Sequence, residues 1–515
     1  MTLYSPQRAR RSLFQTVGLR AVSQIGTVLS YIVLVRAMQE EAFGVYNLFY
    51  SFIPVVATLA SFGLEQTLRR FQPEYLRSGQ AALAARLVRF VASARFAVSV
   101  IMLGVILLGW NVIAPHFSLE AYRADFALFG ILVVLSLQSL ILQLSLAAHM
   151  LHIYSVGSMA ALAIAKLVAY TLITSFGDLT LRTAIVADSV AYGVCYVFLV
   201  VVHRRLRPVE PLAPSSHLAS GERRRLTRYA IFNHLNDAGS LLVYAQTDNF
   251  FVGALLNPVA VATYAFYARL AEMITNVIPI KLFENVVQPL FFAVPSAEAD
   301  ARLPRYFTLL IDINLVVHLP ALAFALAYHR EIVQLLFAGK YLHDSALLPL
   351  VIAMATVPNV VAIPVTLVAQ YFERPALILA SELFGLYQIA AMLLLVPAFG
   401  LYGAALSTGT FHLFRNLFVW WNLRRRVRWH NALAALLMGT LIWSTVVLAC
   451  VSLRALVPMS ALANLGVGGA LCALGILVYL RSPAISQSDR EILANVLHGR
   501  EARMLRWLGL TPRVA

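Results

Sequence analysis

Charged side chains are scarce in this chain of 515 residues: only 12% are Asp, Glu, Lys or Arg, and 60% are hydrophobic. A soluble domain carries about 25% charged residues, so the composition excludes that class. Cysteine is rarer still. The three cysteines all lie in apolar segments and form no CxxC pair, which argues against a disulfide framework or a thiolate metal site. We expect an integral membrane protein with several membrane-spanning helices.

Sequence motifs of known chemistry are also missing. The chain has no GxxxxGK[ST] loop for nucleotide phosphates, no Asp-x-Asp pair for a nucleotide-sugar metal and no GxSxG nucleophile. His149 and His152 lie three residues apart, but no third ligand is near them. We therefore expect no enzyme activity, no cofactor and no metal. The net charge of +16 does not come from a soluble basic segment, so a nucleic-acid partner is not expected.

Long apolar runs dominate instead, and about 20 apolar residues suffice to span a bilayer. The runs predict an all-α polytopic membrane protein with about 14 transmembrane helices. These helices are 15–35, 43–64, 88–109, 124–148, 155–176, 181–203, 229–252, 262–293, 306–328, 344–371, 376–397, 401–422, 431–453 and 460–480.

The positions of Lys and Arg predict the orientation. Of the 40 basic residues, 28 lie on the side that holds both termini, 6 on the opposite side and 6 within helices. Cytoplasmic loops carry the excess of Lys and Arg, so both termini are expected in the cytoplasm.

Two similar basic segments follow the sixth and twelfth helices and predict an internal repeat. Arg204-Arg205 and Arg424-Arg425 are 220 residues apart, and an even helix number gives both repeats the same orientation. The predicted organisation is an N-terminal six-helix lobe, a cytoplasmic linker, a C-terminal six-helix lobe, two extra helices and a cytoplasmic amphipathic tail. Their limits are 1–208, 209–227, 228–428, 429–481 and 482–515. In the tail, Ser488-x-x-Glu491 resembles a capping box.

Polar residues line single faces of otherwise apolar helices. Arg20 and Tyr31 share a face of the first helix, and Asn47 begins a similar face on the second. Lipid penalises such faces, so they are expected to contact protein or water. Small polar residues alone would indicate helix packing, but the intramembrane charges favour an aqueous cavity.

Those charges differ between the two halves. Arg20, Arg95 and Lys166 oppose one acidic residue in the first half, and we expect them to form a cationic path. An arginine fork binds phosphate oxygens bidentately, which suits a diphosphate. The second half has an acidic excess, which suits H⁺ or Na⁺ as a coupling ion.

The stretch 228–293 holds six charges within two predicted helices: Asp237, Asp248, Arg269, Glu272, Lys281 and Glu284. Ionisable groups at membrane depth are costly and usually face a bundle interior or a wet cavity. They could be salt bridges that only join helices, or the wall of a translocation cavity. Asp248 and Arg269 lie at similar depth and are expected to pair near the outer side. Asp237, Lys281 and Glu284 lie nearer the inner side.

Several segments resemble the polysaccharide flippases (Wzx-like) of the multidrug/oligosaccharidyl-lipid/polysaccharide (MOP) exporter superfamily. One is FGVY at 43–46, followed by FGL at 62–64 and RRFQPEY at 69–75. Another is QTDN at 246–249, followed by YAFYARL at 264–270. LYGAA at 401–405 and VRWH at 427–430 also fit, whereas Ala262 stands where the family commonly has Gly.

The resemblance implies a two-lobed, V-shaped bundle that opens alternately to each side of a bacterial inner membrane. Its cargo would be an oligosaccharide on a polyprenyl diphosphate. Polysaccharide polymerase and export machinery would be protein partners, and membrane lipids would surround it. Carried over by residue, Arg20, Arg95, Lys166 and Arg269 would contact diphosphate or acidic sugar, and Asp248 and Glu272 would be coupling or gating carboxylates.

Three other functions stay open. A cation-coupled drug or metabolite exporter of the same superfamily would have fewer basic residues in its first half and usually twelve helices. A membrane glycosyltransferase, polymerase or ligase would need a sizeable external loop, and the longest external loops here have about 15 residues each, near 110–123 and 329–343. No feature favours a scaffold that transports nothing.

Overall fold

The fold is described from a computed structural model, which covers residues 6–206, 220–241, 245–276, 294, 296–372 and 374–496. Every regular element in these ranges is a helix, as the sequence predicted. The chain divides into two compact units, Met1–Ala262 and Thr263–Ala515. The limits predicted for the lobes, linker, extra helices and tail stay predictions, as does the V shape.

The first unit combines long apolar helices with shorter ones and with the amphipathic helix α3. Its elements are α1 (Pro6–Ala37), α2 (Glu40–Leu59), α3 (Leu64–Arg77), α4 (Ala81–Leu108), α5 (Trp110–Ile113), η1 (Ala114–Phe117), η2 (Glu120–Tyr122), α6 (Arg123–Ala148), α7 (His152–Phe176), α8 (Leu181–Leu206), α9 (Ser220–Leu241), α10 (Ala245–Leu255) and α11 (Pro258–Asn276), the last of which runs on into the second unit.

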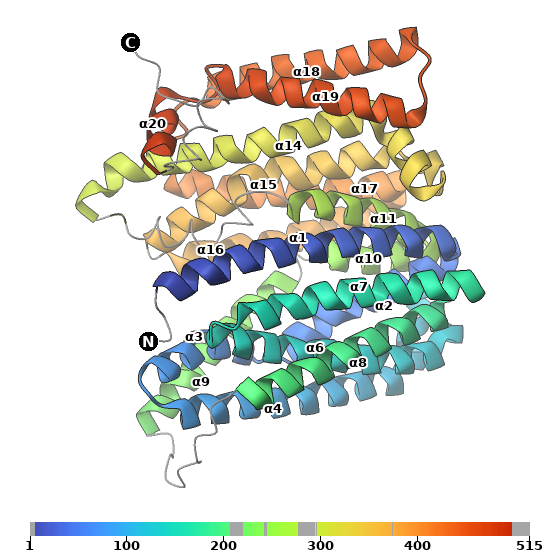
Figure 1. The fold of residues 1–515 in the computed structure, drawn as a ribbon, viewed down its shortest axis with the longest axis vertical. Coiled ribbons are helices and arrows are strands. Elements are labelled where there is room, and N and C mark those ends of the chain that lie inside the picture. Colours follow the sequence, from blue (N-terminus) through green and yellow to red (C-terminus); the bar gives the residue numbers. More distant parts are fainter. Residues whose placement is uncertain are drawn as a thin grey trace. The chain divides into compact units, whose positions relative to one another are not determined.

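Packing in the first unit joins helices that are distant in sequence. Helix α1 lies along α7 over most of its length, and α6 packs on both α8 and α4 (Figure 1). Helix α2 contacts α4, α6, α8, α9 and α10, so it lies inside the unit. Phe49 and Phe52 of α2 pack on Phe126 of α6, each with ring centroids 5.2 Å apart. Residues projected from α2 are therefore surrounded by protein and not by lipid.

The segment after α2 differs from its predicted form. We expected helix 43–64 to lead into a basic loop, but α2 ends at Leu59 and α3 begins at Leu64. The turn between them uses left-handed backbone at Phe62 (φ 44°) and Gly63 (φ 68°). A Cβ on Gly63 would lie 1.9 Å from the carbonyl oxygen of Ala230 in α9. Glycine is therefore needed here for its conformation and for the close approach of α9.

The second unit is built on one long helix, α14. Its elements are η3 (Ser296–Glu298), α14 (Ala299–Phe337), η4 (Leu342–Asp344), α15 (Leu347–Tyr371), α16 (Pro375–Glu382), α17 (Phe384–Leu423), α18 (Ala432–Leu456), α19 (Ala461–Arg481) and α20 (Gln487–Val496). Helix α14 contacts α15, α18 and α19, and α18 pairs with α19 (Figure 1).

Two helices of the second unit, α14 and α17, bend close to positions where the sequence predicted one helix to end, at 328 and 397. Tyr328 interrupts α14 with φ −129° and ψ 20°, and Gly400 interrupts α17 with φ 58° and ψ −133°. In the described residues eleven helices are long and apolar enough to cross a membrane, and the 48-residue span Ala376–Leu423 contains the Gly400 break. The predicted helices 229–252 and 262–293 include residues outside the described ranges. The count of fourteen stays a prediction.

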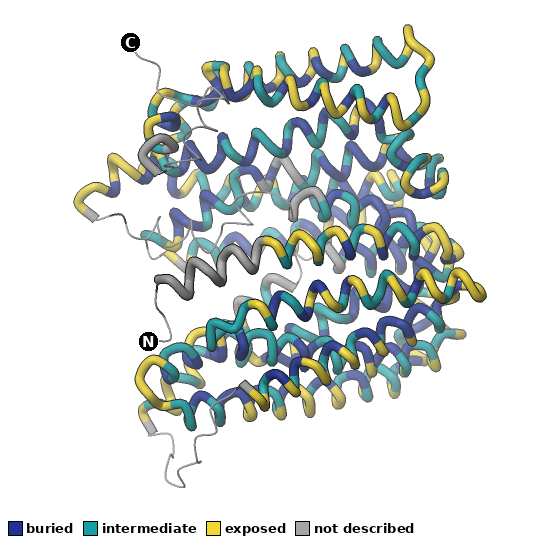
Figure 2. The backbone as a smooth tube through the Cα atoms, viewed as in Figure 1, coloured by how far each residue is buried: buried dark blue, intermediate teal, exposed yellow. Residues whose placement is uncertain are grey.

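Exposed positions recur along many of these helices (Figure 2), and a number of them carry large apolar side chains. Ile101 on α4 and Leu448 on α18 are 63% and 67% exposed. Such surface suits lipid, which needs no hydrogen bonds from the protein. Some charged residues of the spans are, by contrast, buried: Arg95, Asp188, Asp312 and Glu382. The partners of Asp188 define the candidate site.

The start of α20 corrects one detail of the predicted tail. The capping pair is Ser486 and Asp489, not Ser488 and Glu491: the Asp489 backbone N–H donates to Ser486 Oγ (3.2 Å), and the Ser486 N–H donates to Asp489 Oδ2 (3.0 Å). Asp489 is 1% exposed, and a buried carboxylate needs hydrogen-bond donors. This need explains why Ser486 and Asp489 form the capping pair. Residues 497–508 of the predicted amphipathic helix lie outside the described residues.

Candidate functional site

A buried carboxylate, Asp188, lies at the centre of the first unit. Three helices surround it, and each contributes two side chains four residues apart, a spacing that places both on one helix face. We call these six residues the Asp188 cluster: Tyr46 and Tyr50 of α2, Lys166 and Tyr170 of α7, and Asp188 and Tyr192 of α8.

Both oxygens of Asp188 are fully used. Oδ1 accepts from the Tyr170 hydroxyl at 2.6 Å and lies 3.1 Å from Lys166 Nζ. Oδ2 accepts from the Tyr46 hydroxyl at 2.7 Å and from the Tyr50 hydroxyl. The Asp188 side chain is 0% exposed. Four donors on one enclosed carboxylate offset the desolvation that ionisation would otherwise cost.

Lys166 faces the more open side of the cluster. Its ammonium group donates to the Tyr50 hydroxyl at 3.0 Å and lies over two rings, 5.3 Å from the centroid of Tyr50 and 5.1 Å from that of Tyr192. Its side chain is 16% exposed. Aromatic faces attract a cation, so the two rings help to orient the ammonium group of Lys166. It is the one member of the pair that a ligand could reach.

A second polar chain connects α2 with α10. The Asn249 side-chain amide donates to Ser51 Oγ at 2.9 Å, and Ser51 donates to the Asn47 carbonyl at 2.9 Å. Asn47 in turn donates its side-chain amide to the Phe43 carbonyl at 2.7 Å, within its own helix. Asp248, next to Asn249, is 1% exposed. The predicted residues Asn47 and Asp248 thus lie on two helices that contact each other.

Arg95 of α4 is enclosed beneath α3. Its side chain is 1% exposed, and Nη1 lies 2.8 Å from Glu65 Oε2. Glu65 also binds Arg69, at 2.9 Å. Burial opposes ionisation of Glu65, but the two guanidinium groups together outweigh it and hold the pKa of this carboxyl below its usual range. The contact joins α3 to α4, so Arg95 has a structural role in addition to any predicted contact with cargo.

The two predicted residues of α1 have different surroundings. Tyr31 is buried and packs on Phe43 with ring centroids 6.1 Å apart. Arg20 is half-buried, near His152 at the start of α7, and has no acidic partner among the described residues. Of the three expected members of a cationic path, Lys166 and Arg95 each have a carboxylate partner, and Arg20 has none among the described residues.

The remaining predicted residues are distributed over both units. Arg269 and Glu272 of α11 form an ion pair of 2.6 Å across one helix turn, and both are more than a third exposed. Asp237 is half-buried on α9. Lys281 and Glu284 lie outside the described residues. Asp248 and Arg269 belong to different units, so their pairing stays a prediction.

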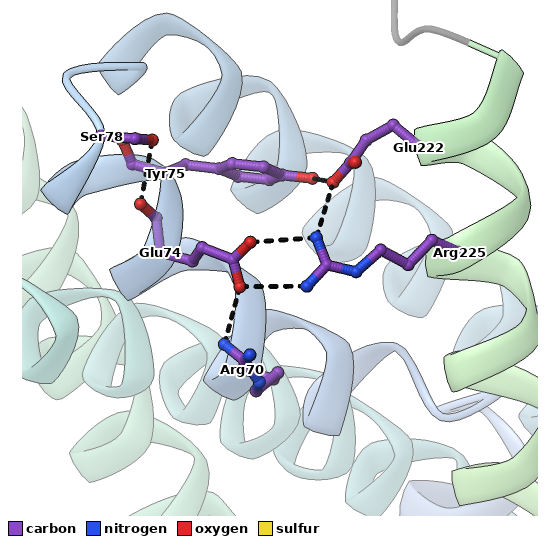
Figure 3. Close-up of polar contacts among 6 residues, drawn as sticks. All are labelled: Arg70, Glu74, Tyr75, Ser78, Glu222 and Arg225. Atoms are coloured by element: carbon purple, nitrogen blue, oxygen red, sulfur yellow. Dashed lines mark hydrogen bonds and ion pairs between the residues drawn. The ribbon is translucent and has the colours of Figure 1, made fainter.

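A network at the end of α3 joins this helix to α9 (Figure 3). Glu74 lies between two arginines, 2.8 Å from Nη1 of Arg70 and 3.0 Å from Nη1 of Arg225. The Tyr75 hydroxyl donates to Glu222 at 2.8 Å. The hydrogen bonds from Arg225 lower the pKa of Glu74, whereas burial and then Glu222 raise the pKa of Tyr75. Glu74 thus holds two helices together across a long sequence separation.

Sequence reasoning missed the tyrosines of the Asp188 cluster, although a signal was present. Tyr46 with Tyr50 and Lys166 with Tyr170 are pairs at i and i+4 within apolar helices. It also missed the Arg415–Glu382 pair of the second unit, whose carboxylate side chain is 7% exposed. Asp312 of α14 accepts from Trp429 Nε1 at 3.2 Å and Asn431 Nδ2 at 2.9 Å, and no spacing predicted these partners.

The sequence model of the polysaccharide biosynthesis protein family matches residues 11–293, more than half of the chain. The chain belongs to the polysaccharide biosynthesis protein family. The match includes all six residues of the Asp188 cluster and the joint between α3 and α9. It confirms the predicted family. No curated protein sequence matches the chain.

Solved structures confirm the fold. The lipid II flippase MurJ in an inward closed conformation superimposes with a TM-score of 0.69 at 9% identity, covering 90% of this chain and 97% of that one. An inward-facing multidrug resistance MATE transporter of the MOP superfamily gives 0.60 at 12%, covering 79% and 98%. A MOP superfamily transporter from Pyrococcus furiosus gives 0.53 at 15%, covering 81% and 94%.

This member of the family is therefore a multi-pass membrane protein, and its fold is that of the MOP-superfamily structures. The eleven apolar helices of the described ranges agree with a location in a membrane. The three solved structures compared above are a flippase and two transporters.

Proposed function

We propose that this protein flips oligosaccharide repeat units, carried on a polyprenyl diphosphate, from the cytoplasmic to the periplasmic leaflet of a bacterial inner membrane. Alternating access of the two halves would move the cargo for exopolysaccharide, capsule or O-antigen synthesis. Membership of the polysaccharide biosynthesis family carries the proposal, because it links this transporter fold to polysaccharide assembly. The lipid II flippase has a similar fold, which supports a lipid-linked cargo.

The basic residues of the first unit are the proposed contacts of the cargo. Arg20 is half-buried without an acidic partner among the described residues, so its charge is available to a diphosphate. Lys166 is held by Asp188 and by two aromatic rings, which fixes the position of its ammonium group. Arg95 and Arg269 are further proposed contacts, although each has a carboxylate neighbour. Tyr31 and Asn47 belong to the proposed polar lining.

Carboxylates are the proposed elements of coupling or gating. Asp248 is buried beside α2, and Asp237 and Glu272 are half-exposed. Together with Lys281 and Glu284 they could bind H⁺ or Na⁺, or break and re-form ion pairs as the protein opens. In liposomes, an ionophore that collapses the H⁺ or the Na⁺ gradient should slow transport. An unchanged rate with both ion gradients collapsed would remove the coupling role.

Reconstitution tests the function directly. Purified protein in liposomes should move a fluorescent polyprenyl-diphosphate oligosaccharide between leaflets, and Arg20→Ala should slow it about tenfold, the size expected for one lost charge-assisted contact. Arg36→Ala is the matched control, because Arg36 is exposed at the other end of the same helix. Equal rates for wild type and both variants would exclude Arg20 from the path. A wild-type rate equal to that of empty liposomes would contradict the function.

A further inference from the structure

A basic groove lies between α3 and α9, apart from the Asp188 cluster. It has a volume of about 860 Å³ and is lined by four arginines: Arg70, Arg224, Arg225 and Arg228. Phe71 and Tyr229 also line it, together with Phe232. A cleft lined by charges of one sign raises the local concentration of counter-ions, so this groove attracts anions.

Aromatic rings hold the arginines in place. The guanidinium carbon of Arg225 lies 4.8 Å from the ring centroid of Phe71, and that of Arg70 lies 5.6 Å from the same ring. Phe71 packs edge-on against Tyr229 with centroids 5.3 Å apart. Arg228 lies 5.9 Å from the ring of Phe232. Stacking of this kind restricts the guanidinium groups without itself using their N–H donors. Arg70 and Arg225 donate to Glu74, whereas Arg228 has its ring contact but no carboxylate partner among the described residues.

The charges of the groove do not cancel. Glu74 compensates Arg70 and Arg225, and Glu222 lies 3.7 Å from Arg225 (Figure 3). Arg224 and Arg228 have no carboxylate partner within the part of the chain that the structure describes. The groove therefore keeps about two positive charges more than its own acidic groups neutralise. A ligand with one or two phosphate charges matches this excess.

The groove continues into an apolar surface. Phe232 lines it and is 63% exposed, and Ile231 and Leu235 on the following turn of α9 are 54% and 59% exposed. Arg228, Phe232 and Leu235 follow at i, i+4 and i+7, so basic and apolar residues share one face of α9. The basic end faces the side predicted to be cytoplasmic. A head group in the groove would have its acyl or prenyl chain against these residues.

We propose that this groove, formed by Arg70, Arg224, Arg225 and Arg228 over Phe71 and Phe232, binds the phosphate head group of a lipid in the cytoplasmic leaflet. The lipid could be an anionic phospholipid, such as phosphatidylglycerol, or a polyprenyl diphosphate. Both present phosphate oxygens to the arginines and a hydrocarbon chain to α9. Only the polyprenyl case rests on the proposed function, because the groove would then capture cargo before transport.

Lipid binding to the full-length protein in nanodiscs tests the proposal. Native mass spectrometry counts lipids retained from phosphatidylcholine alone, from phosphatidylcholine with phosphatidylglycerol, and from phosphatidylcholine with undecaprenyl diphosphate. Wild type should retain one of the two anionic lipids in preference to phosphatidylcholine. The variant Arg224→Gln with Arg228→Gln should bind that lipid at least about tenfold more weakly, since each basic residue near a membrane surface contributes to anionic lipid binding.

The matched control is Arg77→Gln with Arg223→Gln, which removes two exposed arginines from the same helices without touching the groove lining. The control should bind like wild type. Preference for phosphatidylglycerol identifies a phospholipid site, and preference for undecaprenyl diphosphate identifies a capture site. Equal retention by wild type and the groove variant, or equal losses in both double variants, would overturn the proposal. The test reads binding alone, so a failure to flip cargo would count against the proposed function and not against the groove.

Discussion

The Asp188 cluster and the arginine groove hold charge in opposite ways. In the cluster, one carboxylate accepts from four donors and is fully inaccessible. In the groove, Arg70 and Arg225 bind Glu74 and Glu222, and the other two arginines have no carboxylate partner among the described residues. Charge within a span must be neutralised because lipid cannot solvate it, whereas charge at the membrane surface can await a ligand. The Asp188 cluster therefore stabilises the fold, and the arginine groove leaves positive charges available to bind a ligand.

The arginines of α3 and α4 also differ in how far they are buried and in what they can bind. Arg95 is buried against Glu65, and Arg70 is about half exposed beside Glu74. Both contribute to joints between helices, but only the exposed one lines a groove that a lipid could enter. Removing a buried partner should therefore cost stability, and removing a groove arginine should cost binding.

The largest expected effect is that of Asp188→Ala. Lys166 and three tyrosine hydroxyls would lose their common acceptor, and breaking a buried ion pair costs about 3–5 kcal/mol. The free energy of unfolding, measured in mixed micelles with SDS, should fall by about this amount. Asp178→Ala, at an exposed position between α7 and α8, is the control and should change it by less than about 0.5 kcal/mol. A loss in the cluster no larger than in the control would show that Asp188 does not hold these helices.

The second effect concerns the turn that brings α9 onto α3. Gly63→Ala puts a Cβ on left-handed backbone, which costs about 1–2 kcal/mol, and places it 1.9 Å from the carbonyl of Ala230. Gly79→Ala is the control, because Gly79 also has positive φ (74°) but no heavy atom within 4 Å of the new Cβ. Thermal unfolding should show a clearly greater loss for Gly63→Ala. Equal losses would mean that the close approach of α9 contributes nothing.

The third effect is a pH dependence at the joint of α3 and α4. Arg95 and Arg69 lower the folded-state pKa of Glu65 below its ordinary value of 4.5, so the ion pair stabilises the fold at neutral pH. This contribution is fully present above pH 4.5 and is lost as the pH falls through the lowered pKa. Glu65→Gln should therefore reduce stability at pH 7 and match wild type more closely at low pH. A constant difference between the two stability curves down to pH 3 would contradict the assignment.

The smallest expected effect is that of the groove variant on stability. Arg224→Gln with Arg228→Gln removes exposed charges that have no carboxylate partner in the described ranges, so unfolding should change by less than about 0.5 kcal/mol. A loss comparable with that of Asp188→Ala would mean that these arginines are structural. The Asp188 cluster and the groove would then not differ in their contribution to stability.

Helix positions in the membrane followed from the sequence because apolar runs of sufficient length have few alternatives in a bilayer. The predicted ends at 328 and 397–401 coincide with the breaks at Tyr328 and Gly400. Helix α3 was missed because its amphipathic pattern has a negative mean hydropathy and lies between two spans. The partners of Asp188 were missed because they come from two other helices, 18 to 142 residues away. Spacing within a helix shows which residues share a face but not which helix they meet.

The most direct measurement is leaflet transfer of a fluorescent polyprenyl-diphosphate oligosaccharide in liposomes that contain the purified wild-type protein. A membrane-impermeant quencher reports how much label is exchanged between leaflets with time. The account predicts exchange well above that of empty liposomes, slowed by Arg20→Ala and unchanged by Arg36→Ala. Exchange no faster than in empty liposomes, from protein that is folded by thermal unfolding, would contradict it.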